Sequence, residues 1–426
     1  MLRKHGFDEY FEELCARHYE IGGRPSVPPG DYFRMLFIGY FEGIGSERGI
    51  EWRCADSLSL REYLGLELSE RVADHSSLSR IRQRLALEVH IEVFGWVVKV
   101  LGKEKLLRGR NLGGDATSLE ANAAMRSIVR RDTGKSCEKF LEELARNAGS
   151  ENPNRQDVAK IDRNRKGKDS NQDWKLPTDP DSGIMKMKDG RTHLAHKVEH
   201  AVDLETEAVV AIQVRAGPTG DTKTGVETAE LAMVHLQEAQ EAQSRRNFVA
   251  DRGYHSNQSL SDLDEVGLRS YVAEPDRGRR NWKGKEHEKT LVYANRRRIK
   301  GERGKALMRW RAERVERAFQ HCYGREDLRR CNLRGNEKIT KRLLIHVGAH
   351  ILGILMRKMI GAATPRQLAV LREALQSVLC ALQSIFHDHR AMFERYTLWN
   401  PISSSRRLLI QSGSEICRGT RFSTGC

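Results

Sequence analysis

The pattern of apolar and polar positions changes character near residue 108. Before that point apolar residues recur at helical spacing, as at Tyr32, Met35 and Leu36. After it, short runs rich in β-forming residues alternate with amphipathic helical stretches. The sequence therefore predicts an all-α region over residues 1–108 and a mixed α/β core over residues 109–360.

Within the predicted core, the pattern switches repeatedly between periods of two and of 3.6 residues. We expect strands at 111–115, 192–204, 207–214, 248–250 and 271–273, and helices at 224–245, 260–266 and 308–322. A hairpin through Asp203 and Glu205 should join the second and third of these strands. Residues 123–175 are polar and charge-mixed, which predicts an insertion. Within it, residues 162–169 have almost no apolar side chains and are expected to be exposed and to pack little. Residues 361–426 are expected to form a helical or irregular tail.

A basic helix is predicted just after residue 74. Asp74 is a good N-cap, and the helix that follows carries Arg80, Arg82 and Arg84 between its apolar positions. This arrangement is typical of a helix-turn-helix segment that contacts DNA. An ordinary basic surface helix has the same pattern, so the alternative stays open.

Composition narrows the class of protein. The 426 residues include 73 Lys and Arg against 58 Asp and Glu, a formal net charge of +15. The N-terminus has no apolar signal region, and the longest uncharged apolar run, residues 343–356, is shorter than the ~20 residues that span a bilayer. The eight cysteines form no CxxC pair. We expect a cytoplasmic protein without a membrane segment or a zinc module.

The excess positive charge is concentrated in one part of the chain. Residues 276–335 contain 20 basic and 8 acidic residues, a local net charge of +12. Such a block favours a phosphate-binding surface, although a solvated charged face would have the same composition. No Walker pattern occurs, so no nucleotide cofactor is expected.

Three carboxylates lie where a sheet and a helix could bring them together. Asp115 and Asp251 each follow a predicted strand, and Glu316 lies on the helix predicted at 308–322. Hard carboxylate oxygens with open positions suit Mg²⁺ or Mn²⁺. Among 58 acidic residues such triples are common, so spacing alone does not establish a site.

The local sequences around these carboxylates add a resemblance. Residues 115–122 (DATSLEAN), 250–256 (ADRGYHS) and 314–319 (RVERAF) resemble, in order and spacing, the three acidic motifs of bacterial DDE-type insertion-sequence transposases. The likeness extends to residues 23–29, 39–43, 74–79, 188–194, 294–298 and 333–335, and so covers roughly residues 1–365. It implies a ribonuclease-H-like mixed-sheet catalytic core with an N-terminal all-α DNA-binding region.

The same resemblance implies the chemistry and the partners. Asp115, Asp251 and Glu316 would hold two Mg²⁺ or Mn²⁺ ions for cleavage and transfer of DNA strands. The partners implied are double-stranded DNA, as terminal inverted repeats and target DNA, and a second copy of the chain, in the bacterial cytoplasm or nucleoid. The expected contacts to DNA come from nine basic side chains: Arg80, Arg82, Arg84, Arg296, Arg297, Arg298, Lys300, Arg314 and Arg317.

Several alternatives remain at this point. A degenerate transposase or a repressor would bind DNA without catalysis, and a metal-dependent nuclease would cleave without strand transfer. Tyr254 and His255 could line the site or serve the fold, and Trp310 could stack on a base or pack internally. Glu313 is the rival of Glu316 for the third carboxylate.

Overall fold

The structure is a computed structural model of the chain. It describes residues 1–19, 26–150, 152–165, 170–187, 189–239, 245–276, 278, 280–324, 330–361, 374–385 and 387. Some of the predicted features lie partly outside these residues. They are residues 23–25 of one motif, Lys188 of another, residues 277, 279 and 325–329 of the basic block, and most of the predicted tail. The chain divides into two compact units, Met1–Met356 and Arg357–Cys426, and the first holds every site considered below.

The N-terminal region is helical, as predicted. Its helices are α1 (Phe7–Cys15), α2 (Pro29–Glu42), α3 (Glu47–Asp56), α4 (Leu58–Leu64), α5 (His75–Arg84) and α6 (Leu87–Lys103), with short 3-10 turns at Arg3–His5 and Ala16–His18. Asp74 caps α5, because its carboxylate accepts the backbone N–H of Ser77 at 2.9 Å. The predicted cap and the helix that it starts are therefore confirmed.

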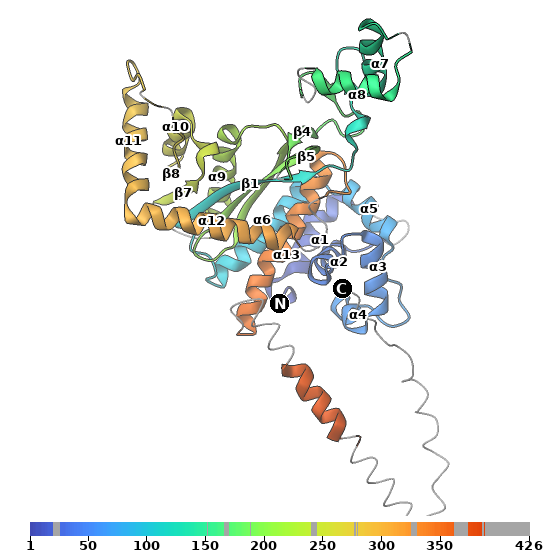
Figure 1. The fold of residues 1–426 in the computed structure, drawn as a ribbon. Coiled ribbons are helices and arrows are strands. Elements are labelled where there is room, and N and C mark those ends of the chain that lie inside the picture. Colours follow the sequence, from blue (N-terminus) through green and yellow to red (C-terminus); the bar gives the residue numbers. More distant parts are fainter. Residues whose placement is uncertain are drawn as a thin grey trace, which may run out of the picture. The chain divides into compact units, whose positions relative to one another are not determined.

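A mixed sheet forms the centre of the rest of the unit (Figure 1). Its strands are β1 (Asn111–Glu120), β4 (Gly183–Lys186), β5 (Thr192–Asp203), β6 (Val209–Ala216), β7 (Arg246–Ala250) and β8 (Leu268–Val272). Strand β5 lies antiparallel to β1 and β6, whereas β1, β7 and β8 are parallel. The order β6-β5-β1-β7-β8 is that of a ribonuclease-H-like sheet, which confirms the predicted fold class.

Helices cover both faces of this sheet. Those that contact its strands are α9 (Asp221–Glu238), α10 (Asn257–Glu265), α11 (Glu286–Lys300) and α12 (Glu302–Tyr323). A 3-10 turn lies at Arg252–Tyr254, and helix α13 (Asn336–Met359) follows α12 in the chain. Successive side chains of a strand point to opposite faces. Glu199 of β5 bonds Thr224 and Thr228 of α9, whereas the next residue, His200, bonds Tyr323 of α12 at 2.7 Å. Helices α9 and α12 therefore lie on opposite faces.

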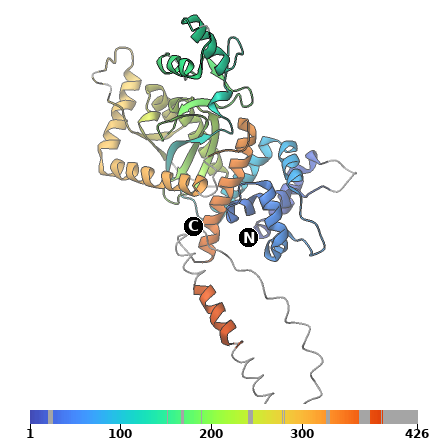
Figure 2. The same cartoon turned by 45° about the vertical axis from the view of Figure 1, so that its right-hand side comes forward.

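The predicted insertion is a small folded segment. Residues 123–175 contain two helices, α7 (Cys137–Asn147) and α8 (Arg155–Asn164), a 3-10 turn at Met125–Ser127, and a small ladder of β2 (Val129–Arg130) with β3 (Trp174–Lys175). Figure 2 shows α7 and α8 as a helical pair. Trp174 is 1% exposed in a separate apolar cluster with Ile128 and Leu194. The insertion therefore has a small core of its own, because a few well-spaced apolar residues suffice for one. Of the stretch 162–169, which was predicted to pack little, only residues 162–165 are among the described residues, at the end of α8.

Helix α12 is longer than predicted and follows α11 after a sharp bend, seen in both views (Figures 1 and 2). It contacts β1, β5, β7 and β8, so one helix passes several strand ends. Helix α13 is long and apolar enough to cross a membrane, but 78% of its most apolar window is buried in the fold. This burial is typical of a core helix. In the second unit, Ala374–Ile385 is helical.

Candidate active site

Two of the predicted carboxylates lie side by side because their strands are parallel neighbours. Gly113 of β1 pairs with Val249 of β7, and Asp115 and Asp251 each follow two residues later. Neighbouring strands are about 4.8 Å apart, so this register brings the two side chains to one place. Strand β1 was predicted to end at Asp115, but it continues to Glu120. Of the two strands that carry the aspartates, only β7 ends here, at Ala250.

Glu316 is positioned by a close approach of α12 to β1. A Cβ atom on Gly113 would lie 2.5 Å from Leu204 Cδ2 and 2.9 Å from Val315 Cγ2. Only glycine therefore lets Val315 pack this closely on the strand. The next residue of the helix is Glu316, which is exposed and lines a groove of about 440 Å³ with Thr117 and other residues of β1.

A buried arginine joins the two aspartates. Arg311 comes from α12, and its Nη2 lies 2.8 Å from Asp115 Oδ2 and 3.5 Å from Asp251 Oδ2. Its Nε donates a hydrogen bond to the Gly114 carbonyl at 3.2 Å. Sequence reasoning missed this residue. The pattern could have indicated it, since Arg311 is four residues before Val315 and seven before Ala318, in the buried stripe of the helix.

Burial and charge act together on Asp115. Its side chain is 24% exposed, and desolvation raises its pKa to about 6. The positive charge of Arg311 lowers the pKa, while the negative charges of Asp251 and Glu316 raise it. The third predicted carboxylate is thus close enough to act electrostatically on the first.

The donor set fits divalent cations in kind. Asp115 and Asp251 already share a cationic group, and Glu316 adds negative charge from the neighbouring helix. Hard oxygens around concentrated charge suit Mg²⁺ or Mn²⁺. Among the described residues, however, no three Asp, Glu, His or Cys side chains are arranged to hold a metal ion as they stand. The guanidinium of Arg311 lies between the two aspartates instead.

The structure places the four residues whose roles the sequence left open. Tyr254 and His255 are 4% and 0% exposed, and the Tyr254 hydroxyl donates to Glu199 at 3.1 Å. They support the loop after Asp251 and do not line the site. Trp310 is partly exposed, and its ring lies under the guanidinium of Arg314 at 4.3 Å. Glu313 forms an ion pair with Arg317.

The basic residues around α11 and α12 fall into two groups. Arg297 and Lys300 are exposed on α11. The others are engaged within the fold: Arg296 pairs with Glu274, Arg298 donates to the carbonyl and hydroxyl of Ser270, Arg314 donates to the Leu204 carbonyl, and Arg317 pairs with Glu207 and Glu313. The local charge of +12 is thus partly neutralised, and Arg297 and Lys300 are the better candidates for phosphate contacts.

The basic side chains of helix α5 also fall into exposed ones and one that is paired within the fold. Arg80 and Arg84 are exposed, one turn apart, and both line an open groove of about 1090 Å³ between α5 and the preceding loop. Arg84 also stacks on the Tyr19 ring at 4.1 Å. Two exposed cations therefore lie on one face of the helix at this groove.

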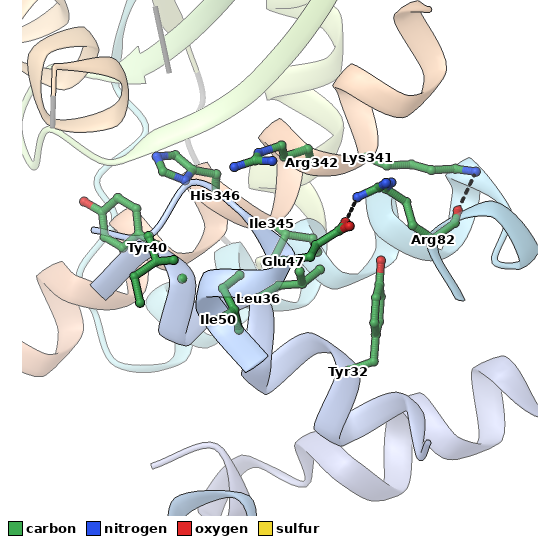
Figure 3. Close-up of a pocket in the computed structure, with 12 residues that line it drawn as sticks. Tyr32, Leu36, Tyr40, Glu47, Ile50, Arg82, Lys341, Arg342, Ile345 and His346 are labelled. Atoms are coloured by element: carbon green, nitrogen blue, oxygen red, sulfur yellow. Dashed lines mark hydrogen bonds and ion pairs between the residues drawn. The ribbon is translucent and has the colours of Figure 1, made fainter. Parts of the chain in front are cut away.

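Arg82, which was predicted to bind DNA, is buried in the fold. The side chain is 9% exposed and forms an ion pair with Glu47, while its backbone carbonyl accepts a hydrogen bond from Lys341 at 3.3 Å (Figure 3). On a helix that packs with one face inward, every residue on that face is buried whatever its charge. Arg82 joins α5 to α3 and α13.

We expect Arg82→Met to destabilise the protein by about 3 kcal/mol, because removing one member of a mostly buried ion pair leaves the Glu47 charge uncompensated. Arg80→Met is the matched control and should leave stability unchanged while weakening DNA binding. Urea unfolding followed by circular dichroism measures the first effect. Equal unfolding midpoints for the two variants would contradict the structural role of Arg82.

Comparison with protein families gives two matches, one over the N-terminal helical region and one over most of the mixed α/β region. Residues 4–84 match the "Transposase domain (DUF772)", and residues 169–352 match the "Transposase DDE domain". The second match contains Asp251 and Glu316 and begins after Asp115. No curated protein matches the sequence significantly.

Three crystal structures of Mos1 complexes are found by structural comparison. The Mos1 mariner paired-end complex with Mn has 10% identity and a TM-score of 0.20, over 74% of this chain and 87% of that chain. A pre-cleavage Mos1 transpososome has 11% identity and a TM-score of 0.20, over 72% and 82%. TM-scores this low support no conclusion about the site. The two family matches, on a ribonuclease-H-like sheet with an N-terminal helical region, show that the chain contains a transposase domain followed by a transposase DDE domain, which is a domain that transfers phosphoryl groups on DNA.

Proposed function

We propose that this chain binds the ends of its own mobile element and catalyses their cleavage and their joining to target DNA with Asp115, Asp251 and Glu316. The observation that carries the proposal is the in-register placement of Asp115 and Asp251 around one buried cation, with Glu316 on the helix that supplies it. Two Mg²⁺ or Mn²⁺ ions are the expected cofactors.

The chemistry explains why carboxylates are needed. In-line attack on a phosphodiester concentrates negative charge on the phosphoryl, attacking and leaving oxygens. Two bound divalent ions would supply Lewis-acid stabilisation of that charge and activate a water or a 3′-hydroxyl. The task of the three carboxylates is to hold positive charge at one place. The proposal is supported by the elements that carry these residues, since Asp251 directly follows β7 and Glu316 lies on α12.

DNA would be held by the exposed cations. Arg80 and Arg84 on α5 are proposed to contact the element end, and Arg297 and Lys300 on α11 the phosphates nearer the site. We further propose a homodimer on DNA, since cleavage at two ends and their joining to one target requires two sites. The bacterial cytoplasm or nucleoid is the proposed location.

Replacing Arg297 and Lys300 together with alanine should weaken binding to all DNA sequences. Loss of two phosphate contacts would flatten the dependence of log K on log salt by up to ~0.9 per contact. Fluorescence anisotropy at several salt concentrations measures the slope. Arg296→Ala is the control, because Arg296 is paired with Glu274 and should change the slope less. An unchanged slope in the double variant would make this part of α11 a solvated face.

Metal binding is expected to weaken below pH 6. Burial raises the pKa of Asp115 to about 6, so protons compete with metal for this carboxylate as the pH falls through that value. Below it, affinity should fall by about tenfold per pH unit for one proton displaced. Mn²⁺ titrations followed by electron paramagnetic resonance between pH 5 and 8 provide the test. A flat affinity between pH 5 and 7 would show that Asp115 is not a ligand.

Cleavage and joining distinguish the proposal from its alternatives. Labelled element-end DNA is incubated with the protein, Mg²⁺ and a second unlabelled duplex, and the products are separated by size. We expect a nick at the element end followed by transfer of its 3′-hydroxyl to the second duplex. Nicking without transfer would indicate a nuclease, and binding without nicking would indicate a non-catalytic DNA-binding protein.

A further inference from the structure

The charge balance at the three carboxylates depends on Arg311. The side chain of Arg311 is 10% exposed, so its guanidinium is largely removed from water. Such a charge is stable only when it is paired. Its partners are Asp115, 2.8 Å away, and Asp251, 3.5 Å away, which are two of the proposed metal ligands.

The Nε and Nη2 atoms of the Arg311 guanidinium have different partners. The Nε atom is anchored by its hydrogen bond to the Gly114 carbonyl. The Nη2 atom is buried and makes ion pairs with both aspartates, and among the described residues it has no other hydrogen-bond partner. A second cation at the same carboxylates would supply the same attraction and would be repelled by the guanidinium.

We propose that Arg311 is a built-in counter-cation, which neutralises Asp115 and Asp251 in the metal-free protein and which divalent ions must displace from these two carboxylates. The proposal rests on the proposed function, because it assumes that the two aspartates are metal ligands. Arg311 is thus a positioning residue that keeps two like charges together on adjacent strands and sets the affinity for metal.

The proposal makes an unusual prediction, which is that removing a buried charge strengthens metal binding. Arg311→Gln removes the competing cation and keeps a side chain that can donate to the Gly114 carbonyl. We expect it to bind Mn²⁺ at least tenfold more tightly than the unmodified protein. A purely structural arginine would give the opposite result, since loosening the site weakens binding.

The experiment is a Mn²⁺ titration of the full chain, with free Mn²⁺ measured by electron paramagnetic resonance. Arg309→Gln is the matched control, because it makes the same substitution at an exposed position on the same helix and should leave Mn²⁺ affinity unchanged. Asp251→Asn, alone and combined with Arg311→Gln, reports on the site itself and should abolish tight binding in both backgrounds.

The outcomes separate the two proposals. Tighter binding in Arg311→Gln that is lost with Asp251→Asn supports the counter-cation. Equal or weaker binding in a folded Arg311→Gln variant overturns it, while loss of binding in Asp251→Asn alone leaves the proposed function standing. Mn²⁺ affinity that is unaffected by Asp251→Asn overturns the metal site, and with it the proposed function.

Folding provides a second test without metal. If Arg311→Gln does not fold, the cause would be the repulsion between the two carboxylates that it leaves behind. The double variant Arg311→Gln with Asp115→Asn removes opposite charges together and should then recover cooperative unfolding in EDTA. Failure of the double variant to recover would show that Arg311 serves packing, and would overturn the proposal.

Discussion

Asp251→Asn is expected to lower DNA strand cleavage at least a thousandfold while leaving the fold and DNA binding close to normal. A thousandfold change corresponds to about 4 kcal/mol of transition-state stabilisation, which is the size expected when a metal ligand is lost. The asparagine keeps an oxygen that can accept the Gly253 N–H, a bond of 2.9 Å in the structure, so the turn after β7 should persist.

The control for this variant is Glu265→Gln, which neutralises an exposed carboxylate at the end of α10. Cleavage of labelled end DNA is measured for both at equal protein concentration, with binding measured in parallel. The control should retain activity within a few-fold. Full activity in Asp251→Asn would remove Asp251 from the catalytic set.

Glu316→Gln is expected to have a similarly large effect on cleavage, and Glu313→Gln a small one. Glu316 acts electrostatically on Asp115 and lines the groove beside β1, whereas Glu313 is exposed and paired with Arg317. The helix is anchored by Val315 and Phe319, which are buried, so neither substitution should unfold it. The effect should be a loss of orders of magnitude in rate for Glu316 only.

Measured side by side, the two glutamine variants identify the third carboxylate. Each removes one negative charge from the same helix, three residues apart, which makes each the control of the other. A large loss in Glu313→Gln with normal activity in Glu316→Gln would reverse the assignment. Thermal unfolding of both variants shows whether any loss arises from the fold.

The parts of the fold that periodicity describes could be predicted from the sequence. The strands at 192–204 and 248–250 and the N-cap at Asp74 agree with β5, β7 and α5. Strand length was harder to predict, since β1 continues through Thr117 and Leu119 beyond the point where local pattern changes. There the ladder with β5 determines where the strand ends.

The side-chain partners could not be predicted from composition. Arg80, Arg82 and Arg84 look alike in sequence, yet Arg82 faces inward toward Glu47, because the packing of α5 on α3 and α13 selects which face is buried. The basic block likewise contains Arg296, which forms an ion pair with Glu274, a residue that precedes the block in the chain. Such pairings join elements distant in the chain, and a local pattern does not report them.

Arg311 shows the same limit at the candidate site. The acidic motifs indicated Asp115, Asp251 and Glu316, but a basic residue among three carboxylates belongs to no motif of metal ligands. Its role emerges only when β1, β7 and α12 are placed together. The sequence therefore predicted the carboxylates of the candidate site, without the arginine that forms ion pairs with two of them.

The most direct test of the account is strand transfer by the purified chain. Labelled duplexes from the DNA that borders the coding sequence are incubated with the protein, a target plasmid and Mg²⁺ or EDTA. We predict that one 3′ end of the labelled duplex becomes covalently joined to the plasmid in Mg²⁺ and not in EDTA, and that Asp251→Asn abolishes the product. Joining that persists in EDTA or in Asp251→Asn would contradict the account.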